Sequence, residues 1–180
     1  PVHVLARRKA LEIDESDGQL GSFPAALALG YAGVSSKNCK GFYKSLLNAA
    51  RVAKLNAEAG AARCFMSAED LTTWAGVSVQ QDLALVSLIG LTHVERNGHH
   101  FIDGMAFAPE AEQRSFLAAH PDLYRRDGGP VRLRIEQGRL RLGSLACPGF
   151  AVAGTTDFAA LRPMRPAPQA RIEPLRRTGT

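Results

Sequence analysis

A pattern of strand, loop and helix repeats through the first part of the chain, and it constrains the fold more than any other feature. The expected strands are short apolar runs that end at Asp14, Lys37, Ser67 and Glu95. These ends lie 23, 30 and 28 residues apart, which is the length of one strand with its crossover helix. Four such units in series predict a parallel sheet in an α/β fold.

The helices between and after these strands follow from apolar spacing and stop signals. Residues 23–29 predict a short helix, with Ser22 as its N-cap and Gly30 just after its end. Residues 41–58 predict the longest helix, because apolar side chains recur at about 3.6-residue spacing opposite a polar side, ahead of Gly60. Two further helices are expected at residues 79–89 and 109–120.

The last structured stretch has a different period. Residues 131–144, VRLRIEQGRLRLGS, alternate apolar and polar side chains on both sides of Gln137 and Gly138. Alternation around a glutamine-glycine pair is typical of two strands joined by a tight turn. The sequence therefore predicts a β-hairpin near its carboxyl end.

Length and composition favour a single globular unit. The chain has 180 residues, 46% of them hydrophobic, which is enough for one real core. No apolar run reaches the roughly 18 residues of a spanning helix, and the first residues lack the regions of a signal peptide. We therefore expect a soluble, cytoplasmic protein with no membrane partner. The cysteines, Cys39, Cys64 and Cys147, are odd in number and widely spaced, so we expect reduced thiols rather than disulfides or a zinc site.

The positive charge is concentrated at one end. The chain carries a net charge of +5, and residues 162–180 hold five arginines and one glutamate. Residues 161–180 are also rich in proline and poor in apolar side chains, which predicts a disordered tail. Because no aromatic side chains are interleaved with the arginines, this tail does not favour nucleic acid as a partner.

Ionisable side chains follow each expected strand, where a candidate site would lie. In barrels and doubly wound sheets alike, ligands meet the carboxyl ends of the parallel strands. Carboxylates together with a lysine suit a hard divalent cation and a base whose pKa the site lowers. The groups are Asp14, Glu15 and Asp17; Lys37 and Lys40; Ser67, Glu69 and Asp70; and Glu95, His99 and His100.

Purely structural interpretations of the same residues are also open. The acidic loop DESDG would also suit a solvated turn or a helix cap, and Lys37 could extend to solvent. Cys39 is a weak candidate nucleophile, because no histidine lies near it in the sequence. His99 and His100 would point to opposite faces of a strand, so at most one would enter a site. Trp74 and Phe101 are expected to pack.

Four segments together resemble a known family. They are IDES, then VSSKNCKG opening a long helix, then HVE, and finally GRLRLGSLACPGFAV. Over roughly residues 11–158 the chain resembles the carboxyl-terminal part of the enolase superfamily, in its mandelate racemase and muconate lactonising branch. The closing segment is the most specific, since members end in a G-x-L-x-L and a P-G-hydrophobic-x-V stretch, and residues 138–152 follow that pattern.

The resemblance implies a fold. Members have a modified (β/α)8 barrel of TIM type with a capping domain, so residues 1–128 would form about four βα units of a partial barrel. Residues 129–160 would form the terminal hairpin that joins the capping domain, and residues 161–180 the tail. A whole barrel needs about 250 residues and eight units. The remaining strands, two further metal carboxylates and a second base would come from a preceding segment or from another copy in a homo-oligomer.

The resemblance also implies a reaction. Members use Mg²⁺ to abstract the proton α to a carboxylate, which would lead to racemisation or dehydration of a hydroxy or sugar acid. Asp14 matches the third of the family's three metal-binding carboxylates, and Glu15 beside it is a further candidate ligand. Lys37 matches the acid/base lysine, and Glu95 resembles a late acid that polarises the small carboxylate substrate.

Two points stay open in this interpretation. Gly41 stands four residues after Lys37, where the family has five, so Lys40 is a second candidate for the catalytic lysine. The alternative function is a non-catalytic remnant or a small α/β protein that binds cations or partners.

Overall fold

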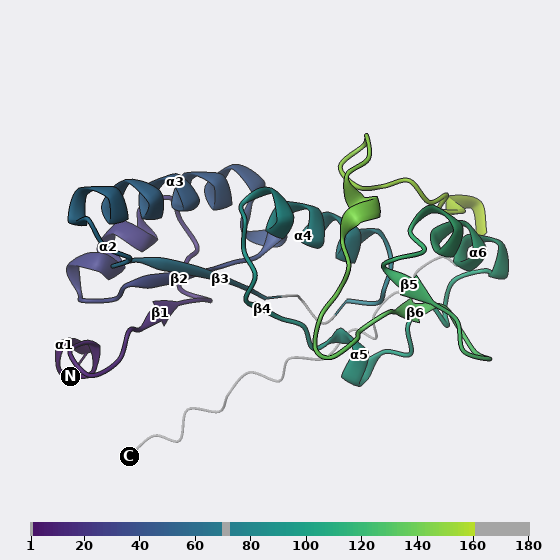
Figure 1. The fold of residues 1–180 in the computed structure, drawn as a ribbon, viewed down its shortest axis with the longest axis horizontal. Helices are drawn as coiled ribbons and strands as arrows, with labels where there is room; N and C mark the ends of the chain where they lie inside the picture. The colour runs from purple at the N-terminus through teal and green to yellow at the C-terminus, as the bar shows by residue number, and fades with distance from the viewer. Residues whose placement is uncertain (1, 70–72, 161–180) are drawn as a thin grey trace, which may run out of the picture.

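A four-stranded parallel sheet organises the first part of the molecule. The computed structural model describes residues 2–69 and 73–160, and Figure 1 shows their arrangement. Neighbouring strands pair in the order in which they occur in the chain, and every pair is parallel. The α/β fold with a parallel sheet is therefore confirmed. The strands are β1 (Glu12–Ile13), β2 (Gly33–Ser36), β3 (Phe65–Glu69) and β4 (Val94–Glu95). The third strand runs to Glu69, two residues beyond the predicted end at Ser67.

Three helices lie on one side of this sheet (Figure 1). They are α2 (Ser22–Ala28), α3 (Phe42–Ala59) and α4 (Val77–Leu88), each within two residues of its predicted bounds. Gly30 follows α2 with a φ of +97°, as a residue after a helix end often does. The prediction that Ser22 caps α2 is wrong, because Gly21 takes the N-cap position. The Ser22 hydroxyl instead accepts a hydrogen bond from the backbone N–H of Gln19.

The long helix α3 turns an unexpected side inward. Its spacing predicts an apolar side opposite Lys44 and Asn48, yet both of these are buried, whereas Leu47 is exposed. The Lys44 ammonium lies 3.0 Å from the Asp17 carboxylate, and Asn48 donates to the same group. Partners on the loop after β1 therefore hold the polar side of the helix against the protein, which helix periodicity by itself does not reveal.

The second part of the molecule is built on a short antiparallel pair. Strand β5 (Tyr124–Arg125) pairs with β6 (Arg132–Leu133), so the domain boundary expected between residues 128 and 129 falls in their connection. The predicted turn at Gln137 and Gly138 is present, with positive φ at both residues and one antiparallel bridge, Glu136 to Arg139. The predicted long hairpin is wrong beyond that bridge, because the first of its strands pairs with β5 instead.

Shorter helices complete the fold. The predicted helix at residues 109–120 is confirmed as α6 (Glu110–Ala119). The expected turn at residues 96–100 contains α5 (Gly98–Phe101), and α1 (Val2–Ala6) was not predicted. The 3-10 helices are η1 (Asn38–Lys40), η2 (Gly143–Leu145) and η3 (Phe158–Ala160). Residues 161–180, the expected tail, and Asp70 lie outside the described residues.

Within the described residues, two clusters of buried apolar side chains form the core. The smaller cluster joins β1, β2 and α2 through Ile13, Phe23, Ala26 and Val34. The larger cluster joins α4, α6, β5 and the segments around them, and it includes Val79, Leu83, Met105, Phe116, Leu123, Tyr124, Val131 and Leu145. The two clusters share no buried residue. Among the described helices, none is long and apolar enough to cross a membrane.

Candidate functional site

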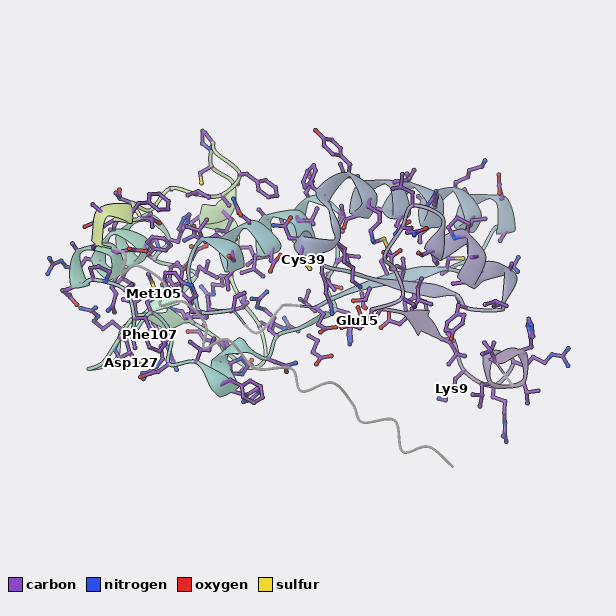
Figure 2. All side chains as sticks on the ribbon, turned by 180° about the vertical axis from the view of Figure 1, so that it is seen from behind. Lys9, Glu15, Cys39, Met105, Phe107 and Asp127 are labelled. Atoms are coloured by element: carbon purple, nitrogen blue, oxygen red, sulfur yellow. The ribbon has the colours of Figure 1, made fainter. Side chains whose placement is uncertain are left out.

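Three carboxylates surround one buried lysine at the carboxyl ends of β1, β2 and β3. Asp14 and Glu15 follow β1, Lys37 follows β2, and Glu69 is the last residue of β3. The Lys37 Nζ lies 3.0 Å from Glu15 Oε1, 3.0 Å from Glu69 Oε1 and 3.3 Å from Asp14 Oδ2. Figure 2 labels Glu15 at this end of the strands. The structure therefore brings Asp14, Glu15 and Lys37 together as predicted, and it adds Glu69.

The second lysine reaches the same group. Lys40 ends η1, and its Nζ lies 2.6 Å from Asp14 Oδ1 and 2.7 Å from the Asp14 backbone oxygen. Gly41 follows with a φ of +109° and starts α3. Both candidate lysines therefore point toward Asp14. The short 3-10 helix η1, between β2 and α3, brings Lys40 to the same side as Lys37.

The charges of this cluster perturb one another. Burial works against the charge on Lys37, but its pairs with Glu15, Glu69 and Asp14 outweigh burial and raise the pKa of Lys37 above its usual range. Burial also opposes ionisation of Asp14, yet hydrogen bonds from Glu69 and Lys40 hold the pKa of Asp14 well below its usual range. Lys37 and Asp14 are consequently an ammonium and a carboxylate at neutral pH.

Glu69 behaves in the opposite way. Burial and the hydrogen bond to Asp14 raise the pKa of Glu69, and Lys37 only partly offsets them. Two carboxyl groups in contact do not ionise independently, so one of them keeps its proton to a higher pH than the other. Here Asp14 keeps the charge, because Lys40 contacts it as well, and Glu69 is the group that holds a proton more readily.

The expectation that the site lowers the pKa of its base is wrong for Lys37 in this arrangement. Three carboxyl groups within 3.3 Å stabilise the ammonium, and a base needs its neutral form. The alternative that Lys37 extends to solvent is also wrong, because its side chain is only 5% exposed. Lys37 is a buried cation that holds three carboxylates together.

The donor set has the chemistry that a hard cation prefers. Oxygens of Asp14, Glu15 and Glu69 lie within 4.8 Å of one another, and Mg²⁺ and Ca²⁺ take carboxylate oxygens. The Lys37 ammonium lies among the same oxygens. A cation bound there would neutralise the negative charge of the carboxylates, which Lys37 neutralises in this structure. Glu69 supplies the third of these carboxylates, whereas from the sequence it was expected only among the ionisable groups that follow the strands. Its signal was its position two residues beyond Ser67, on the same face of β3.

A buried ion pair fixes the loop that carries Asp14 and Glu15. Asp17 is 3% exposed and Lys44 is 7% exposed, and Lys44 also donates to the Asp17 backbone oxygen. Asn48 completes the set by donating to the Asp17 carboxylate at 3.3 Å. The loop after β1 is thus attached to the first two turns of α3, which positions its two site carboxylates.

The remaining candidates lie elsewhere. Glu95 ends β4 next to Glu69 in the strand register, but its carboxylate is exposed and accepts a hydrogen bond from Asn97 at 2.6 Å. His99 and His100 belong to the helix α5 rather than to a strand, and their rings lie 4.0 Å apart. Phe101, expected to pack, is 76% exposed. Cys39 is an exposed free thiol on η1, and Cys64 and Cys147 are also free, as predicted.

Comparison of the chain with protein-family models, with curated proteins and with solved structures finds no match in any of the three.

Proposed function

We propose that this chain is part of an Mg²⁺-dependent enzyme of the enolase type, which moves the proton α to the carboxylate of a hydroxy or sugar acid. One observation carries the proposal. Two lysines and three carboxyl groups from three consecutive strand ends meet at the carboxyl edge of a parallel sheet, which is where such sheets bind their ligands. The outcome for the substrate would be racemisation or dehydration.

Asp14, Glu15 and Glu69 would hold the cation, which supplies stabilisation of the negative charge that develops on the substrate. The carboxylates that then face the cation stabilise the Lys37 ammonium less. Burial remains, and burial lowers the pKa of a lysine. Lys37 would then release its own proton to solvent, and its neutral Nζ would accept the proton from carbon and become an ammonium again.

Two other side chains have supporting roles in this proposal. Lys40 keeps Asp14 ionised through its 2.6 Å contact and is the second candidate for proton transfer. Glu95 stands at the end of the next strand, where it would help to polarise the substrate carboxylate. Its present partner is Asn97, so a bound substrate would have to compete for it.

The proposal includes a completed barrel in a cytoplasmic enzyme. The described sheet has β1 and β4 at its two edges, and a strand edge offers unpaired backbone groups to further strands. A preceding segment or a second copy of the chain would supply the strands that a barrel of this type needs.

A second candidate is a small α/β protein whose acidic cluster binds a cation without catalysis. The raised pKa of Lys37 favours it, because a lysine that is held as a cation contributes to structure whether or not a substrate binds. The two candidates share the metal site and differ in proton transfer.

Two measurements on the whole chain separate them. Millimolar Mg²⁺ is expected to raise the melting temperature, and Glu69→Gln with Asp14→Asn is expected to abolish the rise, whereas Glu58→Gln on the exposed side of α3 should leave it unchanged. In D₂O, a panel of 2-hydroxy and sugar acids should exchange the α-proton, and Lys37→Met should stop this exchange. Stabilisation without exchange would favour the cation-binding candidate. Absence of both effects would contradict both candidates.

A further inference from the structure

A cavity of about 550 Å³ lies apart from the Lys37 cluster. Its walls come from residues 73–75, from residues 96–104 around α5, and from β5 and β6 with the residues that follow. None of the residues Asp14, Glu15, Lys37 and Glu69 lines it. The volume falls in the range of about 300 to 1,000 Å³ that is usual for pockets that bind small molecules.

Close backbone contacts fix two of its walls. A Cβ on Gly98 would lie 2.5 Å from the Thr73 backbone oxygen. Gly104 has a φ of +52°, and a Cβ there would collide with the backbone oxygen of Val131. Only glycine allows these approaches. The segment that carries α5 is therefore held by backbone contacts against two other parts of the chain.

Among the ionisable side chains that line the cavity, basic ones outnumber acidic ones. It contains three arginines and two histidines, and Asp103 is its one acidic side chain among the described residues. Asp103 accepts from Nε and Nη2 of Arg132, and Asp127 Oδ2 forms an ion pair with Arg125, 3.2 Å from its Nε. A guanidinium has further N–H donors beyond these, and its planar fork matches the oxygens of a phosphate. The basic residues are Arg96, His99, His100, Arg125 and Arg132.

Aromatic faces complete the lining. Trp74 packs against the larger core cluster and also borders the cavity. Phe101 borders it too, although its side chain is 76% exposed. The Phe101 ring contacts the His100 ring edge to face, with centroids 6.5 Å apart. The exposed part of Phe101, or Trp74, offers a surface on which a planar ring can stack.

We propose that this cavity binds a ligand of the nucleotide type, in which a planar base is joined to a phosphate. The base stacks on Trp74 or Phe101, and the phosphate takes donors from Arg125 and Arg132. The inference does not depend on the proposed enzyme, because the cavity uses none of the lysines or carboxylates of that site.

Trp74 provides the test, since it is the only tryptophan of the chain. Its fluorescence is measured while adenosine monophosphate is added to the full chain, with adenosine and inorganic phosphate as the two separate halves. A saturable change with the monophosphate, at least tenfold tighter than with either half, is the expected result. No saturable change, or an equal response to phosphate alone, would overturn the proposal.

Matched variants locate the binding. Phe101→Ala and Arg125→Gln are both exposed positions, so folding should be unchanged, and each is expected to weaken binding of the monophosphate at least fivefold. Phe107→Ala, at a side chain 87% exposed and labelled in Figure 2, and Arg141→Gln lie outside the cavity lining and should bind as the original chain does. Equal losses in the control variants would contradict a site in this cavity.

Discussion

At the scale of single residues, Lys37 is the side chain on which the candidate site depends. It is 5% exposed and contacts three carboxyl groups, so Lys37→Met would leave Glu15 and Glu69 without their lysine partner and Asp14 with Lys40 alone. Removing one partner of a buried pair costs about 3 to 5 kcal/mol, and because the carboxyl partners are partly exposed, we expect about 2 kcal/mol. The measurement is urea denaturation at neutral pH.

The pH dependence of this loss has a definite sign. The raised pKa of Lys37 keeps its contribution intact below the ordinary lysine pKa, and the lowered pKa of Asp14 means that the contribution disappears as pH falls far enough to protonate that carboxylate. The effect of Lys37→Met should therefore shrink in acid. Lys54→Met, 75% exposed beside Glu58, is the control and should change stability by less than about 0.5 kcal/mol. Equal losses in the two variants would contradict the role given to Lys37.

Glu69 allows a second prediction at this scale. Its pKa is raised above the ordinary value of 4.5, so the folded state binds its proton more tightly than the unfolded state does. Stability from this group is greatest below that ordinary value and is lost as pH rises through the folded-state pKa. The side chain introduced by Glu69→Gln is neutral at every pH. The free energy of unfolding of this variant should therefore fall less over this range than that of the original chain. Melting temperatures from pH 4 to pH 8 test this, and parallel curves would contradict it.

At the scale of elements, the attachment between the loop after β1 and α3 is the feature to test. Asp17 and Lys44 are both more than nine-tenths buried, so either Asp17→Asn or Lys44→Met alone should cost about 3 kcal/mol. The double variant should lose less than the sum, with a coupling of at least about 1 kcal/mol.

The pair Lys54 and Glu58 provides the comparison on the same helix. Its atoms are 3.7 Å apart on the exposed side, and such pairs couple by only about 0.3 to 0.5 kcal/mol. Double-variant cycles from urea denaturation measure both couplings. If the two cycles gave the same value, the buried pair would not be what holds the loop to α3.

At the scale of the whole molecule, the two core clusters are separate, and we expect them to lose stability separately. Phe23 belongs to the cluster under α2, and Phe116 belongs to the larger one; both are fully buried. Truncation of a buried phenylalanine to alanine costs about 3 to 5 kcal/mol. Native-state hydrogen exchange should show that Phe23→Ala opens β1 and β2 more than β5, and that Phe116→Ala does the reverse. Uniform acceleration in both variants would show that the molecule opens as one unit.

The sequence by itself determined the order of the four parallel strands with the helices between them, and much of the site. Strand ends 23 to 30 residues apart leave room for one helix each, and this local spacing predicts parallel pairing. Because parallel strands bring their carboxyl ends to one edge, the meeting of Asp14, Glu15 and Lys37 could be predicted from position alone.

Only the tertiary structure decided what those residues contact. The burial of Lys44 and Asn48 on α3, the arrival of Glu69 beside Asp14, and the pairing of β6 with β5 all depend on partners far along the chain. The raised pKa of Lys37 depends on the same contacts. Local propensity describes one segment at a time, whereas burial and charge are set by distances between segments, and those distances exist only once the chain has folded.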